Sequence, residues 1–225
     1  MSEWWTYTLS DFLLFSAHTY YRLFELYNRA LWPAPLMTPA LGIVMLACLL
    51  RGGARQTRLA ATMLAVAWLW VAWAFHLERY ASINWAANYF AAGFAIEALL
   101  LIWIGLVRGE WRDMPARDAI HVAGLGVFLF ALFIHPLIGL LLGRPWSQTQ
   151  VFGLAPDPTV VATLGLLLLT SNRARWALFI IPLTWCAISG ATLWAMAAQD
   201  ALLMPLAALL AALLAGWKTL SARPA

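Results

Sequence analysis

Long apolar runs separated by short polar turns dominate this chain. Seven of these runs are expected to be helices that cross a membrane, because a helix satisfies its own backbone hydrogen bonds in hydrocarbon. The alternation expected of a membrane β-barrel is absent. The pattern therefore predicts an all-α, polytopic transmembrane helix bundle. The predicted limits of the spans are 33–50, 59–75, 85–107, 119–142, 159–172, 176–198 and 201–217.

A different pattern precedes the first apolar run. Ser10 is placed to cap a helix with polar side chains on one face and apolar side chains on the other. Such a helix lies on a membrane and does not cross it. We therefore expect an interfacial segment at 1–32, a transmembrane domain at 33–217 and a cytoplasmic tail at 218–225. The polar face comprises Asp11, His18, Arg22, Glu25 and Arg29, and the apolar face Leu13, Tyr20, Leu23, Tyr27 and Ala30.

The composition and the charges support this picture. Of the 225 residues, 64% are hydrophobic and 11% are charged, with a mean hydropathy of +0.78, so lipid is the expected solvent. The net charge of +4 is spread over turns and forms no patch suited to nucleic acid. By the positive-inside rule, the arginine-rich turns predict an amino terminus outside and a carboxyl terminus in the cytoplasm. These turns hold Arg51, Arg55 and Arg58, then Arg108, Arg112 and Arg117, then Arg173 and Arg175, then Lys218 and Arg223.

Several familiar kinds of site are not indicated. Cys48 and Cys186 both lie inside apolar runs, which argues against a disulfide framework or a zinc knuckle. The first residues lack a basic segment followed by an apolar core, so no cleavable signal peptide is expected. No Ser/His/Asp arrangement and no phosphate-binding glycine loop is present. An enzyme is therefore the less favoured class, and no cofactor is indicated.

Glu97 is the first candidate for chemistry, because its predicted position is near the middle of a span. A carboxylate there costs at least a few kcal/mol unless it is paired or hydrated. Two interpretations stay open: a proton or cation relay, or a protonated acid hydrogen-bonded to a neighbouring helix.

His76 and His135 each lie at the outer end of a predicted span, and Asp157 lies at the start of a short one. Imidazole and carboxylate are suitable ligands for a divalent ion, so these three residues form a candidate metal site. No HExxH or comparably close spacing supports the set, and histidines at a membrane interface are more often structural. Asp157 also has a structural interpretation, as the cap of a helix that begins at Pro158.

Three motifs resemble an uncharacterised bacterial membrane family, filed as domain of unknown function 6064. They are Tyr27–Pro33 (YNRALWP), His76–Asn84 with its Ser82-Ile83-Asn84, and Phe152–Thr159 (FGLAPDPT). The resemblance implies a multi-pass bacterial membrane protein and no established activity. The expected location is the inner membrane. The family pattern often has Cys at the position of Asp157 and an amide at that of Glu97. Neither the metal site nor the relay is therefore implied as a mechanism shared by the family.

Three functional hypotheses follow. The first is a small permease or solute-binding protein, in which an outward-facing polar cavity takes a small solute or a proton or cation. The second is an accessory or assembly subunit, whose small-residue faces around Ala211, Gly216, Gly139 and Gly143 bind a membrane partner or a second copy. The third is a membrane-embedded metal enzyme. The cavity of the first hypothesis is expected to be lined by Asn28, Trp32, His76, Asn84, Glu97, His135 and Thr159.

Overall fold

The computed structural model describes residues 15–110, 118–170 and 174–221, and those residues form helices and turns without any strand. The predicted all-α fold is thus confirmed. The helices are α1 (Ala17–Ala30), α2 (Ala34–Arg51), α3 (Ala54–Trp70), α4 (Ala87–Leu101), α5 (Ala119–Leu129), α6 (His135–Leu141), α7 (Pro156–Leu169), α8 (Arg175–Ala195) and α9 (Leu203–Ser221). Wider π-helical turns extend three of them: η3 (Val71–Leu77) after α3, η5 (Ile102–Val107) after α4, and η7 (Phe130–Ile134) between α5 and α6.

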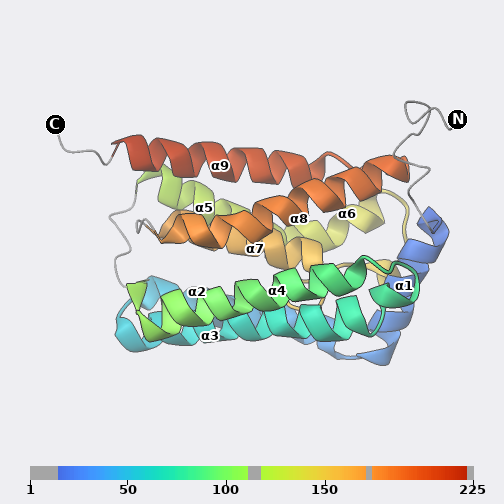
Figure 1. Ribbon diagram of the computed structural model, residues 1–225, viewed down its shortest axis with the longest axis horizontal. Coiled ribbons are helices and arrows are strands. Elements are labelled where there is room, and N and C mark those ends of the chain that lie inside the picture. Colours follow the sequence, from blue (N-terminus) through green and yellow to red (C-terminus); the bar gives the residue numbers. More distant parts are fainter. Residues whose placement is uncertain (1–14, 111–117, 171–173, 222–225) are drawn as a thin grey trace, which may run out of the picture.

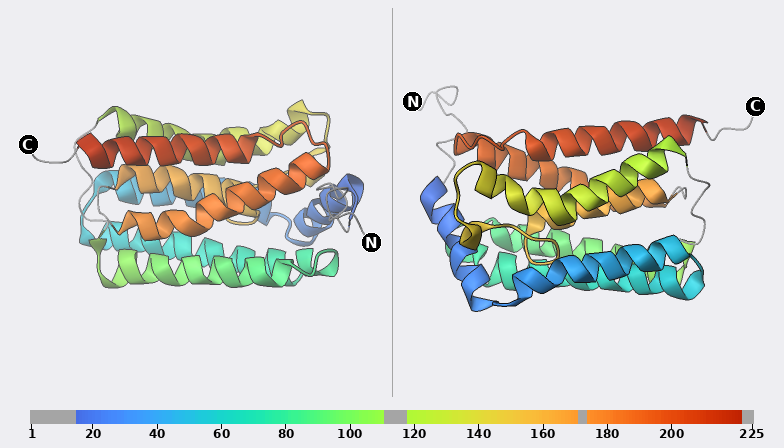
Figure 2. Two further views of the ribbon diagram at one scale, coloured as in Figure 1. Left: turned by 45° about the horizontal axis from the view of Figure 1, so that its top comes forward. Right: turned by 180° about the vertical axis from the view of Figure 1, so that it is seen from behind.

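The long helices run side by side along the molecule, and α1 lies across one end of the bundle (Figure 1). We call this end the α1 end. Two short 3-10 turns, η4 (Tyr80–Ser82) and η8 (Trp146–Gln148), belong to it, and η8 packs against α1. At the opposite end, which we call the basic end, α2 turns into α3 and α9 finishes (Figure 2).

Six helical segments are long and apolar enough to cross a membrane. They match six of the seven predicted spans and are Ala34–Arg51, Ala54–Ser82, Ala87–Val107, Ala119–Leu141, Arg175–Ala195 and Leu203–Ser221. The seventh predicted span, at 159–172, corresponds to α7, which has only 14 residues. At 1.5 Å per residue it is about 21 Å long, which is short of the roughly 30 Å of a bilayer core.

The short helix α7 is the centre of the fold. All of its residues are buried, as is the non-helical segment 151–155 that leads into it. Its neighbours are α3, α5, α8 and α9. A helix that is apolar on every face is stable only when it is covered on every face, which explains this placement. The surrounding protein also shields the non-helical backbone of 151–155 from lipid.

Two basic side chains donate hydrogen bonds to carbonyl groups at the carboxyl-terminal end of α7. Lys218 Nζ donates a hydrogen bond to the carbonyl of Leu168 at 2.8 Å, and Arg175 Nη1 donates one to the carbonyl of Thr170 at 2.7 Å. The last carbonyls of a helix have no partner within the helix, and positive charge near them is favourable. These two basic residues therefore hold α7 in place from α8 and α9.

The helices α5 and α7 cross with their backbones in close contact. A Cβ atom added to Gly124 would come within 2.7 Å of the Gly165 carbonyl oxygen, so only glycine fits there. The stripes predicted from sequence behave differently. A Cβ at Gly143 or at Gly216 would meet no atom within 4 Å, so the prediction of close packing at these two glycines is wrong. Gly143 instead has a φ of +80°, the left-handed region that a turn uses.

The helix α1 is amphipathic, as expected, but its buried face is broader than predicted. Ser16 caps it by accepting a hydrogen bond from the Thr19 amide at 3.2 Å. Ser10, Asp11 and Leu13 lie outside the described residues. Glu25, expected on the polar face, is buried and pairs with Arg22 and Arg29 at 2.7 Å each. The hydrogen bond from Arg22 is the main reason why the pKa of the Glu25 carboxyl lies below its usual range.

Candidate functional site

Asp157 in the first turn of α7 is a buried carboxyl group with hydrogen bonds to both of its oxygens. Its Oδ1 accepts a hydrogen bond from Trp185 Nε1 at 2.8 Å, and its Oδ2 accepts one from Ser189 Oγ at 2.9 Å. The predicted capping role of Asp157 is wrong, because the cap position is Ala155 and the helix already begins at Pro156. The carboxyl group instead ties α7 to α8.

A small polar pocket lies beside Asp157 at the α1 end, and we call it the Asp157 pocket. Its volume is about 20 Å³, enough for about one water molecule. Three of its lining residues carry a buried polar atom with no hydrogen-bond partner among the described residues: His135 Nδ1, Gln150 Oε1 and Asp200 Oδ1. Such atoms are costly to bury, so they mark a place where a polar guest is stabilised. The lining also includes Arg144, Gln148, Thr149 and Met204.

An ion pair forms part of the wall of this pocket. Arg144, in the turn after α6, donates to Asp200 Oδ2 in the turn before α9. The Arg144 guanidinium carbon also lies 4.4 Å from the centre of the Tyr21 ring of α1. Together these contacts join α1, the α6–α7 connection and the α8–α9 turn around one site.

His76 lies in η3 and is fully buried among aromatic rings. Its ring centre is 4.6 Å from that of Phe94 and 5.0 Å from that of Trp185. Neither ring nitrogen has a hydrogen-bond partner among the described residues. His76 therefore contacts the indole that donates to Asp157, but it offers no polar bond of its own.

Glu97 is fully buried in α4, and neither of its carboxyl oxygens has a hydrogen-bond partner in the described parts of the chain. It does not line the Asp157 pocket. The structure thus places the mid-membrane carboxyl predicted from sequence apart from the polar atoms that gather around Asp157.

Asn28 and Trp32 line a second, open pocket at the α1 end, which we call the Trp32 groove. It has a volume of about 360 Å³, and its remaining lining is Arg29, Pro35, Trp146, Ser147 and Thr149. The Asn28 side chain donates to the carbonyls of Ser147 and Thr149 at 2.9 and 2.7 Å, so it fixes the groove wall.

The last two predicted cavity residues make local bonds. Asn84 Oδ1 accepts from the Ala86 amide at 3.0 Å in the turn before α4. Thr159 Oγ1 accepts from the Gly153 amide at 2.8 Å and donates to the Ala155 carbonyl at 2.7 Å, which folds the entrance of α7 back on itself. Of the seven residues, His135 thus lines the Asp157 pocket, and Asn28 and Trp32 line the Trp32 groove.

No three His, Cys, Asp or Glu side chains among residues 15–110, 118–170 and 174–221 are close enough together to hold a metal ion. His76, His135 and Asp157 are included in those ranges, so the described structure gives the predicted metal set no support. Sequence reasoning also missed Trp185, Ser189, Gln150 and Asp200. The sequence did contain one signal for the Arg144–Asp200 ion pair. Asp200 is the sole acidic residue after Asp157, and Arg144 is the sole basic residue between the predicted spans 119–142 and 159–172.

Comparisons with known proteins give one match. Neither the functionally curated proteins nor the solved structures include a significant match to this chain. A family model does match, and it covers residues 17–225, which is nearly the whole sequence. The chain belongs to the family of unknown function DUF6064.

Proposed function

We propose that this protein is a small permease in which the Asp157 pocket is the outward-facing site for a proton or a proton-carrying solute of about the size of water. The observation that carries the proposal is the convergence of unpartnered polar atoms from His135, Gln150 and Asp200 on a pocket beside Asp157. Two of these atoms are side-chain oxygens and accept hydrogen bonds, so they favour a guest that donates them.

The position of Asp157 supports the same function. It stands where a non-helical segment enters a short buried helix, and interrupted helices of this kind form the binding sites of many transporters. Trp185 and Ser189 stabilise its ionised form by hydrogen bonding, and Asp157 also lines the pocket at the α1 end. Asp157 replaces Glu97 as the proposed proton acceptor, because Glu97 does not line the pocket.

Proton flux in reconstituted vesicles tests the proposal. Purified protein is placed in liposomes that enclose a pH-sensitive dye, and a proton gradient is imposed. We expect wild-type protein to dissipate the gradient and Asp157→Asn to slow this at least about tenfold, since the amide cannot carry the proton. Asparagine still accepts the Trp185 hydrogen bond, so the variant is expected to fold.

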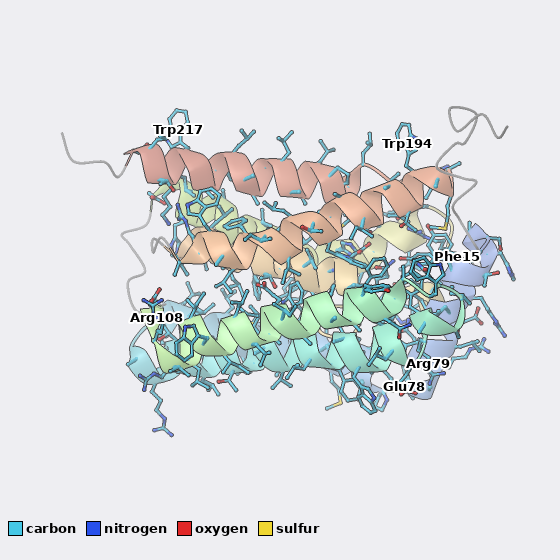
Figure 3. The ribbon with its side chains drawn as sticks, in the orientation of Figure 1. Phe15, Glu78, Arg79, Arg108, Trp194 and Trp217 are labelled. Atoms are coloured by element: carbon cyan, nitrogen blue, oxygen red, sulfur yellow. The ribbon has the colours of Figure 1, made fainter. Side chains whose placement is uncertain are left out.

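The matched control is Glu78→Gln, which neutralises an exposed carboxylate at the same end (Figure 3). It is expected to leave the flux unchanged. Absence of flux with wild-type protein would contradict the proposal. Loss of flux in Glu97→Gln but not in Asp157→Asn would instead assign the relay to the mid-membrane carboxyl.

A further inference from the structure

The Trp32 groove differs in chemistry from the Asp157 pocket. Its volume of about 360 Å³ falls within the range of small-molecule sites, and its walls are mainly the apolar surfaces of Trp32, Pro35 and Trp146. Both tryptophans are exposed, at 62% for Trp32 and 42% for Trp146. A groove of this kind takes a hydrocarbon chain more readily than a polar solute.

The groove is formed before any ligand arrives. Asn28 uses both of its described hydrogen bonds on the backbone of the 147–149 segment. Thr149 Oγ1 in turn donates to the Pro136 carbonyl at 2.7 Å, which ties the same segment to α6. Because these bonds hold the walls in place, little ordering is needed when a chain enters.

A positive charge stands at the rim. Arg29 lines the groove, and its side chain is 64% exposed. Arg22 and Arg29 share the single carboxylate of Glu25, so the group of three carries a net positive charge. An exposed guanidinium beside an apolar groove suits a ligand with an anionic head and a hydrocarbon tail.

The helix α2 carries an exposed apolar surface beyond the groove. Met37, Leu41 and Val44 are all exposed and lie one above another on one face of α2, about half a turn around the helix from the buried Pro35. They form an apolar stripe that runs toward the basic end. The α1 helix, which carries Arg29, lies across the end of the bundle, where the head groups of a bilayer would be (Figure 2).

From this geometry we propose that the Trp32 groove binds an anionic phospholipid. The acyl chain lies in the groove, and the phosphate pairs with Arg29. This site is independent of the permease function proposed above, because the lipid and the transported species occupy different pockets.

Native mass spectrometry of the purified full-length protein tests this proposal. Delipidated protein in detergent is titrated with dioleoyl phosphatidylglycerol or with dioleoyl phosphatidylcholine, and bound lipid is counted. We expect the wild-type protein to prefer the anionic lipid. Arg29→Gln is expected to reduce that preference about fivefold, which is the value of one basic residue at an anionic surface. Arg22→Gln is the matched control, because Arg22 pairs with the same Glu25 but does not line the groove.

A second pair of variants tests the acyl chain. Trp32→Ala removes a groove wall and is expected to weaken binding of both lipids, whereas Trp85→Ala removes an exposed tryptophan outside the described groove lining and is expected to weaken neither. Equal effects of the two arginine variants, or of the two tryptophan variants, would overturn the proposal, as would equal binding of the two lipids by wild-type protein. Proton flux through Asp157 is measured separately, so one proposal can fail while the other stands.

Discussion

At the scale of single residues, His76 and Trp185 are in contact but are expected to respond differently to mutation. His76→Phe replaces a ring whose two nitrogens lack described partners with an apolar ring of similar shape, so stability is expected to stay equal or to rise. Trp185→Phe leaves Asp157 Oδ1 without its donor and is expected to cost about 1–3 kcal/mol. Thermal unfolding in detergent measures both. A large loss of stability in His76→Phe would show that the imidazole has a polar partner.

The same residues show the limit of prediction from sequence. Polar side chains in apolar runs were easy to find, and Asn28, His76, Glu97 and His135 are indeed buried. Which polar groups bond to one another in the core was not predictable, because these hydrogen bonds join segments far apart in the chain. Asp157 and Trp185, for example, are 28 positions apart, and Asn28 and Thr149 are 121 apart. Hydropathy reports which side chains avoid water, but it carries no record of which helices meet.

At the scale of helices, α5 offers two glycines with opposite expected behaviour. Gly124→Ala would place a Cβ against the Gly165 carbonyl, so it is expected to destabilise the protein by about 1–3 kcal/mol. Gly126→Ala meets no atom within 4 Å and is expected to be neutral or to gain up to about 1 kcal/mol of helix propensity. The difference between the unfolding temperatures of the two variants measures the effect of crowding the contact between α5 and α7. Equal values would mean that α5 and α7 have room to separate.

Helix positions were predictable from sequence, and helix contacts were not. The length of an apolar run follows from the thickness of a bilayer, which is why six spans were found close to their observed limits. The close crossing of α5 and α7 was missed, since Gly124 and Gly126 look alike in sequence and differ only in which one faces α7. The central burial of α7 had one usable signal, a uniformly apolar helix too short for a lipid-exposed span.

At the scale of the whole molecule, the number of passages along the bundle decides whether α1 and the end of α9 lie on the same side. The α1 helix and the last residues of α9 lie at opposite ends of the bundle, so the chain passes from end to end an odd number of times (Figure 1). Six long helices alone would bring it back to its starting side. We therefore expect the segment 151–155 and α7 together to make a seventh passage, with the non-helical part supplying the length that the helix lacks.

One labelling experiment tests both the number of passages and the orientation expected from the positive-inside rule. Arg51 ends α2 and Arg55 lies at the start of α3, and Arg108 lies at the same end of the bundle (Figure 3). That end is therefore expected in the cytoplasm and the Asp157 pocket outside. Ser82→Cys and Ser221→Cys each place an exposed thiol, one at the α1 end and one at the basic end. A membrane-impermeant maleimide is expected to label the first in intact cells and the second only after lysis, while the buried Cys48 and Cys186 stay unlabelled. Labelling of both engineered thiols from outside would mean an even number of crossings between the two sites. That result would contradict a seventh passage through α7. Labelling of Ser221→Cys alone would invert the molecule and turn the Asp157 pocket toward the cytoplasm.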